Sequence, residues 1–135
     1  MTTPAKRLRR LAVFNDSAQT LSIIAKWFEI HGYGVVTAQI SMMRIAHVDV
    51  QALVATHRPD VIVFDIAMPY ESNWDFLEVV RLLPKLQGIP IVVTTSNKVA
   101  LESLVGPTTA MQIIGKPSDL GALQRLVDTA FTNPD

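Results

Sequence analysis

Short apolar runs alternate along the chain with segments in which apolar residues recur at helical spacing. Five runs rich in Val, Ile and Phe lie at 10–14, 35–38, 61–64, 90–94 and 112–115. The runs at 61–64 and 91–93 are apolar at every position, which is typical of strands covered on both faces of a sheet. The pattern therefore predicts five strands that form a parallel sheet.

The segments between these runs have the periodicity of amphipathic helices. Apolar residues recur at the spacing of one helix face in the sets Leu21, Ile24 and Phe28; Phe76, Val79, Val80 and Leu83; and Leu120, Leu123, Val127 and Ala130. Gly32 is expected to end the first helix, and Ser72 and Asp75 to form a capping-box variant at the start of the third. This alternation predicts an α/β fold with five βα units in a doubly wound sheet.

Composition narrows the class of protein. The 135 residues favour one domain, and 49% hydrophobic against 18% charged residues is enough apolar material for a sizeable core. Twelve cationic and 12 acidic residues cancel, which argues against direct binding of nucleic acid. The absence of cysteine excludes disulfides and thiolate metal sites. Without a membrane-spanning run or a secretory signal, we expect a cytoplasmic protein with no membrane partner.

The first ten residues hold four of the 12 cations. This basic segment is either an electrostatic arm for an acidic partner or a solvated tail, and its shortness and lack of aromatic residues favour the tail. We therefore expect a basic N-terminal tail over 1–9, one folded domain over 10–132 and a short C-terminal end over 133–135, with no output domain.

Polar residues follow four of the five apolar runs. Asn15 and Asp16 follow the first run, Asp65 the third, Thr95 the fourth and Lys116 the fifth. Because the carboxyl ends of parallel strands meet at one edge of a sheet, where open α/β sheets bind ligands, we expect these side chains to lie together. Two carboxylates, a hydroxyl and a lysine predict a site for a divalent cation and a phosphoryl group.

These residues, in this order, resemble the receiver domain of bacterial two-component response regulators, the CheY-like superfamily. The similarity covers about 10–131, and its strongest part is 59–69, the segment around Asp65. The segment 89–95 and the pair Lys116-Pro117 match in type and order. The resemblance implies a flavodoxin-like sheet with strand order 2-1-3-4-5.

The resemblance also assigns roles to the site residues. Asp65 would be the phosphoacceptor, taking a phosphoryl group from a histidine kinase, a phosphotransfer protein or a small phosphodonor. Asp16, Asp65 and the backbone carbonyl of Ala67 would hold Mg²⁺, which prefers oxygen ligands. The hydroxyl of Thr95 and the cation of Lys116 would contact the phosphoryl group.

Several positions depart from the pattern of that family. Asn15 replaces one of two adjacent acids and is either a weak metal ligand, acting through water, or a spectator. Ile113 stands where an aromatic residue usually reports phosphorylation, and Asn73 where a glycine is usual, an exchange that we expect to be mild because Asn tolerates left-handed conformations. The segment Ile40–Val50 is longer than usual and should form a loop or an extra helical turn near the site. The Lys116-Pro117 peptide is expected to be cis.

The leading interpretation is a phosphoacceptor signalling module that is not an enzyme beyond its own phosphorylation and slow self-dephosphorylation. In that family the positions of Ala67 and Asn97 tune the hydrolysis of the aspartyl phosphate, and here neither residue brings a carboxylate that would help water attack. The implied output face comprises 97–105, 112–115 and 118–131, through which a downstream protein would bind or the chain would form a homodimer.

Two other interpretations stay open. A degenerate receiver would bind partners without phosphorylation, as Asn15 and Ile113 suggest. A flavin protein on the same fold is disfavoured, because the segment 15–20 offers acids where a cofactor phosphate needs backbone amides, and no GxGxxG or P-loop is present.

Overall fold

The computed structural model describes residues 8–106, 112–115 and 120–132. Its elements follow in the order β1 (Arg9–Phe14), α1 (Ala18–Ile30), β2 (Tyr33–Ala38), α2 (Ile40–Arg44), α3 (Val50–His57), β3 (Val61–Ile66), α4 (Tyr70–Arg81), the 3-10 helix η1 (Pro84–Leu86), β4 (Ile91–Thr95), α5 (Lys98–Val105), β5 (Gln112–Gly115) and α6 (Leu120–Thr132). The five predicted strands are all present, and the long segment after β2 contains the extra short helix α2. Within the described ranges, no helix has both the length and the apolar character needed to cross a bilayer.

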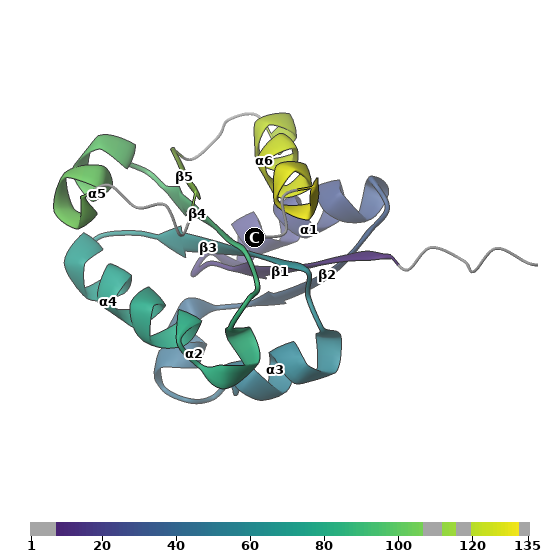
Figure 1. Ribbon diagram of the computed structural model, residues 1–135, viewed down its shortest axis with the longest axis horizontal. Helices are drawn as coiled ribbons and strands as arrows, with labels where there is room; N and C mark the ends of the chain where they lie inside the picture. Colours follow the sequence, from purple (N-terminus) through teal and green to yellow (C-terminus); the bar gives the residue numbers. More distant parts are fainter. Residues whose placement is uncertain (1–7, 107–111, 116–119, 133–135) are drawn as a thin grey trace, which may run out of the picture.

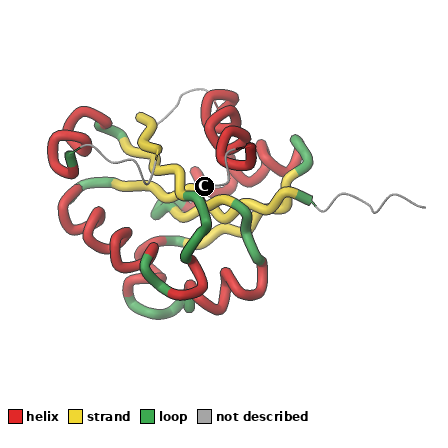
Figure 2. The backbone as a smooth tube through the Cα atoms, in the orientation of Figure 1, coloured by secondary structure: helices red, strands yellow, loops and turns green. Residues whose placement is uncertain are grey.

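The five strands form one parallel sheet in the order β2-β1-β3-β4-β5. The predicted strand order and fold class are therefore confirmed. Figure 1 shows α1 and α6 on one side of the sheet and α2, α3 and α4 on the other, and Figure 2 shows the strands enclosed between the helices. All strands point the same way, so their carboxyl ends meet at one edge.

Each face of the sheet has its own hydrophobic core. One cluster packs buried residues of α2, α3, α4 and α5 against the strands, and the other does the same with α1 and α6. The core on the first side includes Leu77 and Leu101, and the core on the second includes Phe28 and Val127, each 0% exposed. Two covered faces explain why the central strands are apolar at consecutive positions.

β3 is the central strand, and all six of its residues are buried. The ring of Phe64 lies edge-on to Phe14 of β1, with centroids 6.1 Å apart, and 6.4 Å from the ring of Phe76 on α4. Such aromatic contacts add to the large area that each ring buries. They fix β3 against its neighbour strand and against α4, and so fix the position of the next residue, Asp65.

The start of α4 differs from the sequence-based expectation. The helix begins at Tyr70 with Pro69 in the N-cap position, and no side chain caps it. Proline fixes φ near −65°, and Pro69 has φ −74°, so the chain turns into the helix directly after it. Ser72 consequently lies inside the first turn, and the predicted capping box of Ser72 and Asp75 is wrong.

Tyr33 at the start of β2 connects the sheet to α6. The residue is 6% exposed, its ring lies edge-on to Phe28 with centroids 5.0 Å apart, and its hydroxyl donates to Oδ1 of Asp128. Tyr33→Phe keeps the ring and removes the donor, so we expect it to lower the free energy of unfolding by about 1–2 kcal/mol. Urea unfolding followed by circular dichroism measures the change, and an unaltered midpoint would contradict this role for the hydroxyl.

Candidate functional site

Asp65 lies at the carboxyl end of the central strand, next to a threonine of β4. Its side chain is buried, with 6% exposure, and its Oδ1 accepts a hydrogen bond from Oγ1 of Thr94 at 2.7 Å. The two residues are register partners in the sheet, and Ile66 is paired with Thr95. Directly paired residues present their side chains on the same face. The sequence reasoning missed Thr94, although strand alternation after fixing the register would have found it.

Thr95, the hydroxyl expected at the site, is fully buried. Its Oγ1 accepts from the backbone N–H of Asn97 at 3.5 Å, and Oδ1 of Asn97 in turn accepts from the N–H of Ala100 at 3.0 Å as the cap of α5. In this structure Thr95 therefore shapes the connection between β4 and α5. Its predicted contact with a phosphoryl group stays a prediction.

Asn15 and Asp16 follow β1, and both side chains bind backbone amides. Asn15 is 4% exposed, and its Oδ1 accepts from the N–H of Ser17 at 2.9 Å. Asp16 is exposed, and its Oδ1 accepts from the N–H of Ser41 in α2 at 2.7 Å. Ser17 is the N-cap of α1, and its Oγ accepts from the backbone N–H of Thr20. Asp16 thus joins the first loop to the extra helix α2.

The loop between β3 and α4 contains the backbone carbonyl expected to face a metal. The carbonyl oxygen of Ala67 accepts from Nδ2 of Asn73 at 2.7 Å. Asn73 lies within α4 and is not among the described non-glycine residues with positive φ, so the expectation that its tolerance of left-handed conformations matters here is wrong. The hydroxyls of Tyr70 and Ser96 lie 3.3 Å apart and connect this loop to the one after β4.

The donor atoms at this edge are all oxygens, which fits Mg²⁺ in kind. Each of the four expected ligand residues already uses one oxygen in a hydrogen bond within the protein: Asn15, Asp16, Asp65 and Ala67. Within the described part of the chain, no three Asp, Glu, His or Cys residues gather in a way that could hold a metal.

Residues 1–7 of the predicted basic tail and the predicted C-terminal end over 133–135 lie outside the described residues, and so do two features predicted for the site. These are the cation of Lys116 and the cis peptide between Lys116 and Pro117. A cis peptide does occur in the described chain, between Met68 and Pro69 in the loop that follows Asp65. The backbone of β5 pairs with β4, and Gly115 is the partner of Thr95, so β5 ends at the same edge of the sheet as Asp65.

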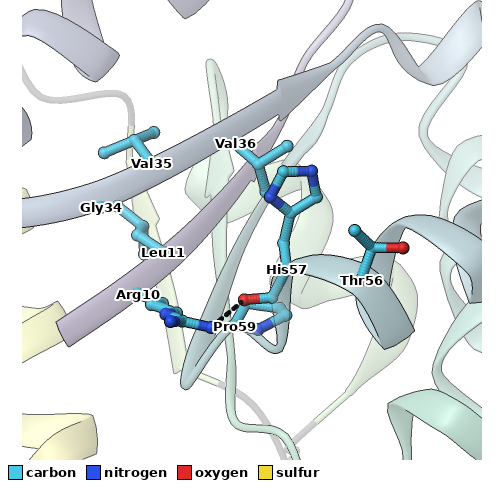
Figure 3. Close-up of a pocket in the computed structure, with 8 residues that line it drawn as sticks. All are labelled: Arg10, Leu11, Gly34, Val35, Val36, Thr56, His57 and Pro59. Carbon is cyan, nitrogen blue, oxygen red and sulfur yellow. Dashed lines mark hydrogen bonds between the residues drawn. The ribbon is translucent and has the colours of Figure 1, made fainter. Parts of the chain in front are cut away.

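A pocket of about 430 Å³ lies at the other end of the strands. Figure 3 shows its lining, which comprises Arg10, Leu11, Gly34, Val35, Val36, Thr56, His57 and Pro59. The guanidinium of Arg10 donates to the carbonyl of His57 at 3.1 Å. The strand residues of the lining belong to β1 and β2, and the others come from the end of α3 and the turn before β3, so the pocket is separate from the Asp65 edge.

Comparison with solved structures identifies proteins that have a similar fold. The chain is similar to a response regulator protein from Burkholderia multivorans, with 28% identity, coverage of 91% of this chain and 94% of that one, and a TM-score of 0.59. It is similar to the chemotaxis protein CheY4 of Vibrio cholerae, with 22% identity, coverage of 91% and 98%, and a TM-score of 0.67. A third similar structure is the signal receiver domain of a putative Luxo repressor protein from Vibrio parahaemolyticus. It has 16% identity, coverage of 95% of this chain and 93% of that one, and a TM-score of 0.69.

No protein-family model and no curated protein matches the chain. The solved structures nevertheless agree with one another and cover nearly the whole chain. The chain has the fold of CheY-like receiver domains, and the predicted resemblance is confirmed at the level of the fold.

Proposed function

We propose that the chain is a receiver module of a two-component system that accepts a phosphoryl group on Asp65. The observation that carries the proposal is the place of Asp65, a buried carboxylate at the carboxyl edge of the central strand of a receiver fold. A carboxylate oxygen of Asp65 would attack phosphorus, and the bond from phosphorus to the donor would break. The donor would be phosphohistidine on a histidine kinase or phosphotransfer protein, or a small acyl phosphate.

The surrounding groups support such a transfer by positioning and neutralising charge. The carboxylates of Asp16 and Asp65 and the carbonyl of Ala67 would hold Mg²⁺, which when bound supplies positive charge to the phosphoryl oxygens. Thr95 and Lys116 would contact the transferred group. The protein would have no enzymatic activity apart from its own phosphorylation and slow dephosphorylation.

Two threonines compete for the role of hydroxyl donor, and matched valine substitutions separate them. Thr95→Val should slow phosphorylation by about tenfold or more, since a hydrogen bond to a charged group is worth about 1.5–3 kcal/mol. Thr94→Val removes the donor that Asp65 has in the resting structure, so its main effect should be on the free energy of unfolding. The rate of phosphorylation by acetyl phosphate measures the first effect, and the midpoint of urea unfolding measures the second. The reverse pattern would assign the phosphoryl contact to Thr94.

The output would be altered affinity for a protein partner at the α5–β5–α6 face. On α5, Val99 is 75% exposed and Leu104 is 46% exposed, so this helix offers apolar side chains to a partner or to a second copy of the chain. A partner that binds these side chains would be bound more or less tightly when the β4–α5 connection moves α5. That connection contains Asn97, two residues after Thr95.

A second candidate is a receiver that binds its partner without phosphorylation. The hydrogen bonds to Asn15, Asp16 and Ala67 favour it, because each occupies an oxygen that a metal would use. The amide at position 15 also brings no negative charge to the site.

Beryllofluoride, a mimic of the phosphoryl group, distinguishes the two candidates. We expect its addition with Mg²⁺ to shift amide resonances around Asp65 and along α5, because the mimic would engage the same oxygens as a phosphoryl group. Fluoride with Mg²⁺ but without beryllium is the control. A spectrum that does not change with beryllofluoride would favour the phosphorylation-independent module.

A further inference from the structure

The carbonyl of Ala67 accepts a hydrogen bond from Asn73 on α4, which in turn accepts one from Arg44 on α2. The amide nitrogen of Asn73, on α4, donates to it at 2.7 Å, and the amide oxygen of Asn73 accepts from Nη2 of Arg44 at 2.6 Å. The same nitrogen of Arg44 also donates to the carbonyl of Ser72 at 3.1 Å. A continuous chain of hydrogen bonds therefore runs from α2 to the loop that follows Asp65.

Arg44 is the last residue of the extra helix α2. Its guanidinium lies over the ring of Phe76 with Cζ 4.6 Å from the centroid, a cation–π contact that limits its movement although the side chain is exposed. A guanidinium has only donors, so the amide oxygen of Asn73 must face Arg44. The amide nitrogen then has to face the carbonyl of Ala67.

We infer that Arg44 and Asn73 are positioning residues that lower the affinity of the Asp65 site for Mg²⁺ by engaging the Ala67 carbonyl. The inference rests on the proposed function, which assigns that carbonyl to the metal. The amide of Asn73 uses one of the two lone pairs of the carbonyl and turns the positive end of its N–H dipole toward the oxygen. Arg44 adds a positive charge to an edge where Asn15 already supplies no negative charge.

Mg²⁺ demands near-ideal octahedral geometry at short distances. Its binding at the Ala67 carbonyl would therefore require the oxygen to turn away from the amide of Asn73 or to share itself between two positive partners. A glycine at position 73 would impose neither condition. Asn73→Ala removes the amide while keeping a residue that favours the helix, so it isolates the hydrogen bond from backbone effects.

The test is a titration of the isotope-labelled protein with MgCl₂ alone, followed at the amide of Met68. This amide belongs to the same peptide group as the Ala67 carbonyl, so it reports directly on that oxygen. We expect Asn73→Ala to shift the Met68 signal before any metal is added. We also expect it to lower the dissociation constant for Mg²⁺ by about three- to tenfold, which corresponds to the usual net worth of one hydrogen bond.

A double-mutant cycle shows whether Arg44 acts through Asn73. Arg44→Gln should tighten Mg²⁺ binding by a smaller factor than Asn73→Ala. If Arg44 acts through Asn73, its effect should be smaller still when Asn73 is already alanine, because only the direct effect of the charge is then left. Arg81→Gln is the matched control, because Arg81 lies at the opposite end of α4 and pairs with Glu78 at 2.9 Å. That variant should leave the Mg²⁺ titration unchanged.

The outcomes separate this inference from the proposed function. Mg²⁺ binding by Asn73→Ala that is equal to or weaker than that of the wild type would overturn the inference, even if the wild type takes up a phosphoryl group. So would the absence of Mg²⁺ binding in every variant. Binding gained only after Asn73→Ala would support the inference, and phosphorylation would still be judged from the wild-type protein with acetyl phosphate.

Discussion

Asp65→Asn should abolish phosphorylation of the chain while leaving its fold intact. The amide lacks the nucleophilic carboxylate, so no acyl phosphate can form at position 65. It keeps an oxygen in the place of Oδ1, which accepts from Thr94 at 2.7 Å in the wild type. Asparagine is therefore a sharper test than alanine, which would remove the acceptor of a buried hydroxyl at a cost of about 1–3 kcal/mol.

The matched control for this substitution is Asp60→Asn. Asp60 lies just before β3, and its Oδ2 accepts from the backbone N–H of Arg10 at 2.9 Å at the opposite end of the strand. The Asp60 variant should be phosphorylated as the wild type is. Intact mass after incubation with acetyl phosphate and Mg²⁺ measures both, and an adduct that persists in Asp65→Asn would place the acceptor elsewhere.

Phe64→Ala should lower the free energy of unfolding more than Tyr33→Phe or Thr94→Val does. Phe64 is fully buried in the central strand, and its ring lies close to the rings of Phe14 and Phe76. Its truncation loses the free energy gained by burying the ring away from water and leaves a cavity between β3 and α4. Together these two effects cost about 3–5 kcal/mol. Because single domains are stable by only about 5–15 kcal/mol, this loss is a large fraction of the total.

Urea denaturation gives the change in the free energy of unfolding, provided that the slope of the transition stays constant. Val99→Ala is the control, because Val99 is 75% exposed on α5 and its truncation should change the free energy of unfolding by less than about 0.5 kcal/mol. Equal effects of the two substitutions would show that Phe64 does not lie in the core as described.

The fold could be predicted from sequence because its strongest signals are local. The consecutive apolar residues of 61–64 arise from the two covered faces of the sheet, and the helical spacing of Phe76 and Val80 arises from one face of α4. The start of α4 was harder to predict, because Pro69 and Ser72 both favour helix starts and the conformation of the loop decides between them. The segment that contains the short helix α2 was expected to be a loop or an extra helical turn, since the five residues of α2 give little periodicity to detect.

The site was less predictable because its contacts join distant segments. The sequence places Asp16 near a strand end, but its partner Ser41 is 25 residues away and belongs to a helix whose bounds were unknown. The bond between Arg44 and Asn73 spans 29 residues and depends on the packing of α2 against α4. Thr94 and Thr95 are neighbours with equal chemistry, and only the register of β3 and β4 tells which one faces Asp65.

We propose that Asp65 accepts a phosphoryl group in a reaction that depends on Mg²⁺. The most direct test is the intact mass of the wild-type protein after incubation with acetyl phosphate, with Mg²⁺ and with the metal removed by a chelator. We expect an adduct of one phosphoryl group that appears only with Mg²⁺. No adduct at any time of sampling, with Mg²⁺ and phosphodonor in excess, would contradict it.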